Sequence, residues 1–163
     1  MNGLLDIYTV AFFGHRYIDN PFLVDDFLDE YLRELMSKHE YVDFLIGRNG
    51  DFDQLCSSAV LRTKKNYRDD NSSLILVLPY ATAQYRDNQD GYEDYYDEIE
   101  VYFKSAKSHP KAAIQKRNRY MVDRADLIIC YIENDSGGAY QTIQYAEKQS
   151  KKIINIAKRN EFE

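Results

Sequence analysis

Residues 127–149 read LIICYIENDSGGAYQTIQYAEKQ, and this stretch decides the fold class. It opens with the continuous apolar run Leu127–Ile132, passes through a turn that holds Gly137 and Gly138, and closes in the helix-like pattern Ala139–Gln149. A continuous apolar run, unlike an alternating one, is typical of a strand buried on both faces of a parallel sheet. The stretch therefore predicts a strand, a glycine turn and a helix, in that order.

The same arrangement recurs along the chain. Asn20 followed by Pro21 predicts a helix start, Asp51 is a candidate cap for a second helix, and Lys111–Arg124 predicts a third helix. Strands that alternate with helices form βαβ units. We therefore predict an α/β fold, a Rossmann-like three-layer domain with a mostly parallel central sheet of about five strands. The other four predicted strands are Ile7–Phe13, Val42–Ile46, Leu74–Leu78 and Ile153–Ile156.

The segment Pro79–Pro110 interrupts this rhythm, because it is polar, acidic and rich in tyrosine. It predicts a loop with one short helix that could serve as a lid over a site. The chain has 163 residues and shows no internal repeat, low-complexity stretch or linker. We therefore expect residues 1–163 to form a single domain.

Composition narrows the choice of partners. The formal net charge of -6 argues against bulk attraction to a nucleic-acid backbone or an anionic membrane, although a local arginine cluster can still bind a small anion. The sequence shows no apolar stretch of membrane-spanning length and no signal-peptide pattern, so we expect a cytoplasmic protein with no membrane partner. Cys56 and Cys130 lie among apolar neighbours and are expected in the core, not in a disulfide. The fifteen tyrosines have three possible places: a homo-oligomer interface, a pocket lining, or half-buried positions on a helix.

Candidate ligand-binding residues follow from the predicted sheet. In open α/β sheets, ligands bind beyond the carboxyl ends of the strands, and glycines there allow the backbone to approach closely. Helix N-termini at the same edge offer unpaired N–H groups to an anion. The residues that the strand-to-helix turns place at this edge are Gly14, His15, Arg16, Gly47, Arg48, Asn49, Gly50, Asp51, Asp53, Ser136, Gly137, Gly138 and Ala139.

The charges at this edge are mixed. Arg16 and Arg48 could each pair with a phosphate or a carboxylate, whereas Asp51 and Asp53 would repel a phosphate and suit helix capping or a ribose hydroxyl. This balance favours a nucleoside-like ligand with few negative charges. His15 is either an acid–base group or a neutral hydrogen-bonding residue, and a neighbouring arginine favours the neutral form.

Two further arginines, Arg117 and Arg119, lie in the helix before the last glycine turn and could point to the same edge, with a solvated helix face as the alternative for Arg119. The spacing of His, Cys and acidic residues indicates no metal site. The sequence also lacks the GxGxxG, P-loop and GxSxG motifs. We therefore expect no metal and no cofactor, and the residues identify no catalytic group.

Three stretches carry a family resemblance: TVAFFGHR at Thr9–Arg16, FLIGRNGDFDQL at Phe44–Leu55, and the long block Ala113–Ile156. They resemble the SLOG superfamily, in particular its small stand-alone bacterial members. The resemblance covers most of the chain and is weakest over Pro79–His109. It implies a Rossmann-like sheet that binds nucleotides or nucleotide-derived ligands, with the family's Arg-Asn pair at Arg117 and Asn118.

One departure from the family pattern bears on function. The lonely-guy phosphoribohydrolases of this superfamily carry a glutamate in the helix after the glycine turn, where Gln144 stands here, and the nearest acid is Glu147. An amide cannot supply the negative charge that stabilises an oxocarbenium-like sugar. We therefore expect binding or sensing of a nucleotide-derived small molecule, with a nucleotide N-glycosidase or phosphoribohydrolase as the alternative. The superfamily also contains a DNA-uptake processing protein, but the acidic balance argues against nucleic acid as a partner.

Overall fold

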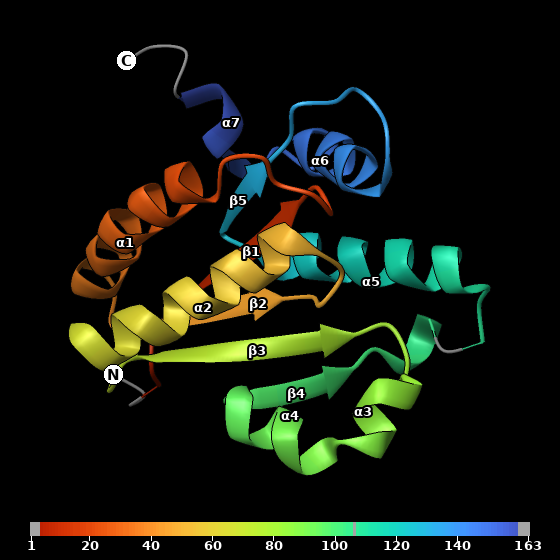
Figure 1. Cartoon of the computed structure of the whole chain (residues 1–163), viewed down its shortest axis with the longest axis horizontal. Helices are drawn as coiled ribbons and strands as arrows, with labels where there is room; N and C mark the ends of the chain where they lie inside the picture. Colours follow the sequence, from red (N-terminus) through yellow and green to blue (C-terminus); the bar gives the residue numbers. More distant parts are fainter. Residues whose placement is uncertain (1–3, 106, 160–163) are drawn as a thin grey trace.

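The apolar runs form one six-stranded sheet in which all neighbouring strands are parallel (Figure 1). The structure is a computed structural model that describes residues 4–105 and 107–159. The strand order is β4-β3-β2-β1-β5-β6, which confirms the predicted α/β class with six strands in place of about five. The strands are β1 (Ile7–Gly14), β2 (Tyr41–Ile46), β3 (Ser72–Leu78), β4 (Glu98–Val101), β5 (Leu127–Tyr131) and β6 (Lys152–Asn155).

Helices cover both faces of the sheet, as Figure 1 shows. Alternate side chains of β1 point to opposite faces, so Val10 and Phe12 join one buried cluster while Ala11 and Phe13 join the other. The first cluster is covered by α1, α2 and α7, and the second by α5 and α6. The helices are α1 (Pro21–Lys38), α2 (Asp51–Asn66), α3 (Ala83–Asp87), α4 (Gln89–Tyr95), α5 (Pro110–Arg124), α6 (Gly138–Lys148) and α7 (Ile156–Arg159).

Local chemistry sets where these helices begin. Asn20 caps α1, because its side-chain oxygen accepts from the Leu23 N–H at 3.3 Å and Pro21 follows as the first helical residue. The prediction that Asp51 caps α2 is wrong. Gly50 holds the cap position without a side-chain bond, and Asp51 is the first residue of the helix. Its carboxylate instead accepts from the Ile18 N–H at 3.0 Å, which ties α2 to the turn after β1.

The segment Pro79–Pro110 contains more structure than a loop with one short helix. It forms α3, α4, the edge strand β4 and a short 3-10 helix, Phe103–Ser105. Strand β4 reads EIEV, in which glutamates alternate with apolar residues, so it lacks the adjacent apolar residues by which the other strands were predicted. No helix within the described ranges is long and apolar enough to cross a membrane.

The chain order creates a switch point at the middle of the sheet. From β1 the chain moves to β2, β3 and β4 on one side, and then returns to β5 and β6 on the other side of β1. The loops that follow β1 and β5 therefore leave the sheet in opposite directions and open a crevice at its carboxyl edge.

Gly14, the last residue of β1, lies where α2 comes closest to that crevice. A Cβ atom at this position would lie 2.3 to 2.6 Å from three carbon atoms of Phe52, a side chain that is fully buried. One of these atoms is the Cβ of Phe52, so rotation of the ring cannot relieve the overlap. Only glycine lets the strand and the helix pack at this distance.

We expect Gly14→Ala to lower the free energy of unfolding by about 1–3 kcal/mol, because the added methyl overpacks a fixed aromatic ring. Gly138→Ala is the matched control. Its Cβ would meet only the end of the flexible Gln115 side chain, at 3.1 Å, and the change should stay within about 0.5 kcal/mol. Urea unfolding of both variants measures the difference, and equal losses would contradict the packing argument.

Candidate functional site

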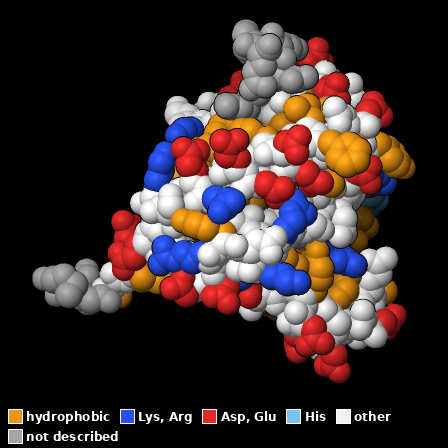
Figure 2. Space-filling view, turned by 60° about the vertical axis from the view of Figure 1, so that its left-hand side comes forward, with side chains coloured by type: hydrophobic (Ala, Val, Ile, Leu, Met, Phe, Trp, Pro, Cys, Tyr) orange, Lys and Arg blue, Asp and Glu red, His pale blue; other side chains and the backbone are white. Residues whose placement is uncertain are grey.

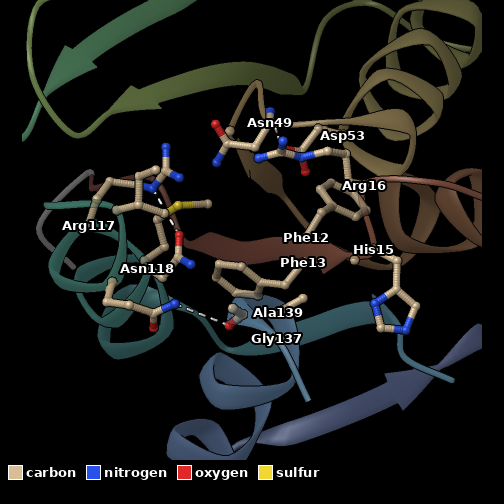
Figure 3. Close-up of a pocket in the computed structure, with 16 residues that line it drawn as sticks. Phe12, Phe13, His15, Arg16, Asn49, Asp53, Arg117, Asn118, Gly137 and Ala139 are labelled. Atoms are coloured by element: carbon tan, nitrogen blue, oxygen red, sulfur yellow. Dashed lines mark hydrogen bonds between the residues drawn. The ribbon is translucent and has the colours of Figure 1, made fainter. Parts of the chain in front are cut away.

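A pocket of about 290 Å³ opens at the carboxyl edge of the sheet, at the switch point (Figure 3). Its walls come from the end of β1, the turn between β2 and α2, one face of α5 and the start of α6. In Figure 3, Phe13 lies at the centre, with Arg117 on one side and Arg16 on the other. The pocket is therefore built from segments that are far apart in the sequence.

The pocket gathers most of the residues that the sequence placed at this edge. Gly47 and Gly137 come from two different strand-to-helix turns and border the same cavity, as the strand order requires. Arg48, Gly50, Asp51 and Ser136 do not line it, although they were predicted with the others. The predicted residues that do line it are Gly14, His15, Arg16, Gly47, Asn49, Asp53, Arg117, Asn118, Gly137, Gly138 and Ala139.

The start of α6 borders the pocket and carries no side-chain cap. Gly137 precedes the helix with φ of +99°, a left-handed conformation that favours glycine. The carbonyl of Gly138 accepts from Gln115 Nε2 at 3.3 Å and from the Thr142 hydroxyl at 3.0 Å. These bonds fix the helix start against α5, and the uncapped N–H groups and the positive end of the helix dipole favour an anion.

The most unusual residue of the site is a buried arginine. Arg117 is 1% exposed, and its Nη1 donates to the Val77 carbonyl at 2.7 Å while its Nε donates to Asn118 Oδ1 at 2.9 Å. Asn118 Nδ2 in turn donates to the Thr142 hydroxyl at 3.0 Å. Burial lowers the pKa of Arg117 to about 10, although the nearby Asp53 carboxylate favours the charged form. A cation is thus held under the pocket, within a network that joins β3, α5 and α6.

Asp53 is the counter-charge to this cation. Its Oδ2 accepts from the Asn49 N–H at 2.9 Å, which closes the turn after β2. Burial raises the pKa of Asp53 above its usual range, while the Asn49 N–H and then Arg117 act in the opposite direction. A Cβ at Gly47 would lie 3.1 Å from Asp53 Oδ2 and 3.2 Å from Arg117 Nη1, so glycine leaves room for both charges.

His15 holds a loop in place. Its Nε2 accepts from the backbone N–H groups of Glu133 at 2.8 Å and Asn134 at 3.2 Å, in the loop between β5 and α6. The Nε2 lone pair is therefore occupied by the loop. This geometry favours the hydrogen-bonding alternative over an acid–base group.

Arg16 is the exposed cation at the pocket mouth. Its backbone carbonyl accepts from the Asp51 N–H at 2.8 Å, so the turn after β1 is fixed to the start of α2. Its guanidinium, by contrast, makes no hydrogen bond or ion pair with any residue that the structure describes. It is free to pair with an anion that enters the pocket.

Five lining residues were missed by the sequence analysis, and most of them are apolar. A signal for some of them was present, because Ile114, Arg117, Asn118 and Met121 share one face of α5 at helical spacing. Arg119 points elsewhere, lies exposed and stacks on the Tyr145 ring at 5.2 Å, so the solvated-face alternative describes it. The missed lining residues are Phe12, Phe13, Ile114, Gln115 and Met121.

The site offers little to a metal ion. Within the described ranges, no group of three or more His, Cys, Asp or Glu side chains is arranged to hold one. Of the described residues that line the pocket, Asp53 alone carries a carboxylate. Gln144 is exposed and does not line the pocket. Its Nε2 donates to the Tyr140 hydroxyl at 3.0 Å.

Comparison with solved structures shows the fold in two DNA-processing proteins. DNA processing protein A (DprA) from Streptococcus pneumoniae matches with a TM-score of 0.63 and 16% identity, over 90% of this chain and 49% of that chain. DprA from Helicobacter pylori, described for its single-stranded DNA binding mode, matches with a TM-score of 0.63 and 17% identity, over 90% of this chain and 63% of that one. The chain thus spans about half of the first protein's length. No protein-family model matches the sequence, and no curated protein does.

These neighbours correct two of the sequence-based predictions. We expected a binder or sensor of a nucleotide-derived small molecule and argued against nucleic acid, but the proteins that share the fold process DNA, and one binds single-stranded DNA. Both predictions are therefore wrong. The alternative of an N-glycosidase or phosphoribohydrolase gains no better support, since Gln144 lies outside the pocket.

Removal of the buried cation tests how far the site depends on it. Arg117→Ala leaves the Val77 carbonyl and Asp53 without their partner and opens a cavity, so we expect a loss of about 3 kcal/mol or more in the free energy of unfolding. Arg119→Ala, two residues along the same helix but exposed, should cost about 0.5 kcal/mol or less. Urea unfolding compares the two, and similar losses would contradict a structural role for Arg117.

Proposed function

We propose that this chain binds single-stranded DNA, and that the pocket at the carboxyl edge receives a phosphate of the strand. The observation that carries the proposal is the convergence of three anion-binding elements on one cavity. They are the free guanidinium of Arg16, the uncapped start of α6 and the buried cation of Arg117. The shared fold with a DprA protein described as binding single-stranded DNA supports the same ligand.

The local charge balance supports an anion despite the net charge of -6. Arg16 and Arg117 together outnumber Asp53, the one acid among the described lining residues. Arg117 acts from below the cavity, where burial reduces the screening of its charge by water. A phosphate at the N-terminus of α6 would also meet backbone N–H groups. Elsewhere, acidic and basic side chains are interspersed, as on the face in Figure 2, so few additional phosphate contacts are expected.

A recessed site of this kind favours a single strand over a duplex. The pocket lies between loops, and Phe12 and Phe13 form part of its lining. A flexible strand can turn one nucleotide into such a hollow, while a duplex keeps its bases paired and its backbone on a regular surface. Because few phosphates are contacted, the affinity should fall only gently with added salt.

We also propose that the chain is a SLOG-type protein and forms a single domain. The quoted glycine turns and the Arg117–Asn118 pair support a SLOG-type assignment, and the six-stranded sheet supports one domain. The Arg-Asn pair would then serve as the buried base of the binding pocket, since Arg117 and Asn118 are hydrogen-bonded to each other and both line it.

Fluorescence anisotropy with a labelled oligodeoxynucleotide of about 12 nucleotides tests the proposal. We expect binding of the single strand that weakens only gently with added salt. We also expect weaker binding of the matching duplex, and about a tenfold loss of affinity for Arg16→Ala, since charge-assisted hydrogen bonds disappear. Arg62→Ala is the control, because Arg62 pairs with Asp29 on α1, far from the pocket lining. The proposal fails if the single strand does not bind, or if both variants lose affinity equally.

Asp53 gives the binding a defined pH dependence. Since burial raises the pKa of this carboxyl, it gains a proton at a higher pH than an ordinary aspartate. As the pH falls through that raised pKa, the pocket loses its one negative charge and the affinity for the strand should rise. Asp53→Asn should bind more tightly than the parent at neutral pH and lack this pH-dependent gain. An unchanged pH profile in Asp53→Asn would show that Asp53 does not face the bound phosphate.

A further inference from the structure

A second hollow adjoins the first on the other side of the turn between β2 and α2. This cleft of about 390 Å³ shares Gly47 and Asp53 with the first pocket, so the two open next to each other. Its remaining wall comes from α2, α3 and the residue that follows α4. The polar side chains that line it are Arg48, Asp51, Gln54, Ser57, Gln84 and Tyr96.

Arg48 is held rigidly in the wall of this cleft. Its Nη1 donates to the Tyr96 hydroxyl at 3.1 Å, and its guanidinium carbon lies 4.8 Å from the centre of the Tyr92 ring. Tyr92 and Tyr96 are each 4% exposed, so the surface on which Arg48 rests cannot move easily. Arg48 itself is exposed. One face of the guanidinium therefore lies on a tyrosine, and the other is available to the cleft.

The tyrosines that hold Arg48 belong to a packed cluster from α3, α4 and the following residue. Tyr85 lies 5.4 Å from Tyr92, Tyr92 lies 6.2 Å from Tyr96, and Tyr96 lies 4.8 Å from Tyr95, between ring centres. The Tyr95 hydroxyl is 3.3 Å from the Ser57 hydroxyl, which fastens the cluster to α2. The segment therefore forms a fixed wall beside Arg48 in this structure.

We propose that this cleft is a nucleobase subsite for the same single strand, in which a base stacks on the Arg48 guanidinium and donates from an amino group to Asp51 or Asp53. The inference rests on the proposed function, since it needs a strand whose phosphate occupies the first pocket. Unpaired bases are commonly bound by stacking on arginine planes and by hydrogen bonds to their exposed edges.

The charges of the cleft favour a base over a second phosphate. Two carboxylates, those of Asp51 and Asp53, face one cation, Arg48, so an additional phosphate would meet net repulsion. Asp51 uses its Oδ2 to accept from the Ile18 N–H, which leaves its Oδ1 for a ligand. Adenine, cytosine and guanine offer amino groups to a carboxylate, whereas thymine offers none. The subsite should therefore discriminate against thymine.

The turn that separates the two hollows, at Gly47 and Asp53, would allow one DNA strand to enter both. Gly47 gives this turn no side chain, and a Cβ there would lie 3.1 Å from Asp53 Oδ2. A nucleotide with its phosphate in the first pocket can thus place a neighbouring base across this turn. The two hollows then hold adjacent parts of one strand, with Arg16 beside the phosphate and Arg48 beside the base.

The experiment compares labelled oligothymidylate of about 12 nucleotides with the same strand carrying one central dA, dC or dG. We expect each substituted strand to bind the parent protein about tenfold more tightly than oligothymidylate, the size of one good base contact. Arg48→Lys keeps the charge but loses the planar surface, so it should bind all four strands equally. Arg16→Ala should weaken all four by the same factor and keep the preference.

The possible results separate the two proposals. Equal binding of all four strands by the parent protein overturns the base subsite and leaves single-stranded DNA binding intact. A preference that survives in Arg48→Lys overturns the stacking role of Arg48. A failure of every strand to bind overturns both proposals, and thermal unfolding of each variant shows whether a loss reflects misfolding.

Discussion

The site depends on one arginine that is buried at the carboxyl edge of the sheet. A guanidinium out of water is costly unless its donors are satisfied and a counter-charge is near. Arg117 meets this condition through the Val77 carbonyl, the Asn118 side chain and the neighbouring Asp53. The same bonds hold the end of β3 against α5, so the cation of the pocket and the packing of the fold are one arrangement.

The local charge of the pocket differs in sign from the net charge of the protein. Net charge acts over the whole surface and is screened by salt, whereas a cation under a recessed pocket acts at short range and with little screening. Asp53 moderates this attraction, because its carboxylate lines the same pocket and is held there by the Asn49 N–H. The proposed binding would therefore use a small number of defined contacts rather than a broad basic surface.

The tyrosine-rich segment Pro79–Pro110 forms one wall of the second cleft, beside the sheet. Strand β4 extends the sheet by one edge strand, and α3 and α4 bring Tyr92 and Tyr96 beside the turn that carries Arg48. The arginine is thereby fixed outside the first pocket, over a wall of aromatic rings. Arg16 and Arg48 each lie two positions beyond the end of a strand, yet they line different hollows.

The sequence alone determined the α/β class, five of the strands and the edge at which the pocket opens, because parallel strands leave apolar runs and their turns must meet at one edge. It did not reveal β4, in whose EIEV sequence glutamates separate the apolar residues. Only the tertiary structure decided that Arg117 is buried while Arg119 is exposed, and that Asp51 bonds Ile18 while Asp53 faces the pocket. Those outcomes depend on which helix face meets the sheet and on contacts between distant turns, and neither is contained in the local pattern of residues.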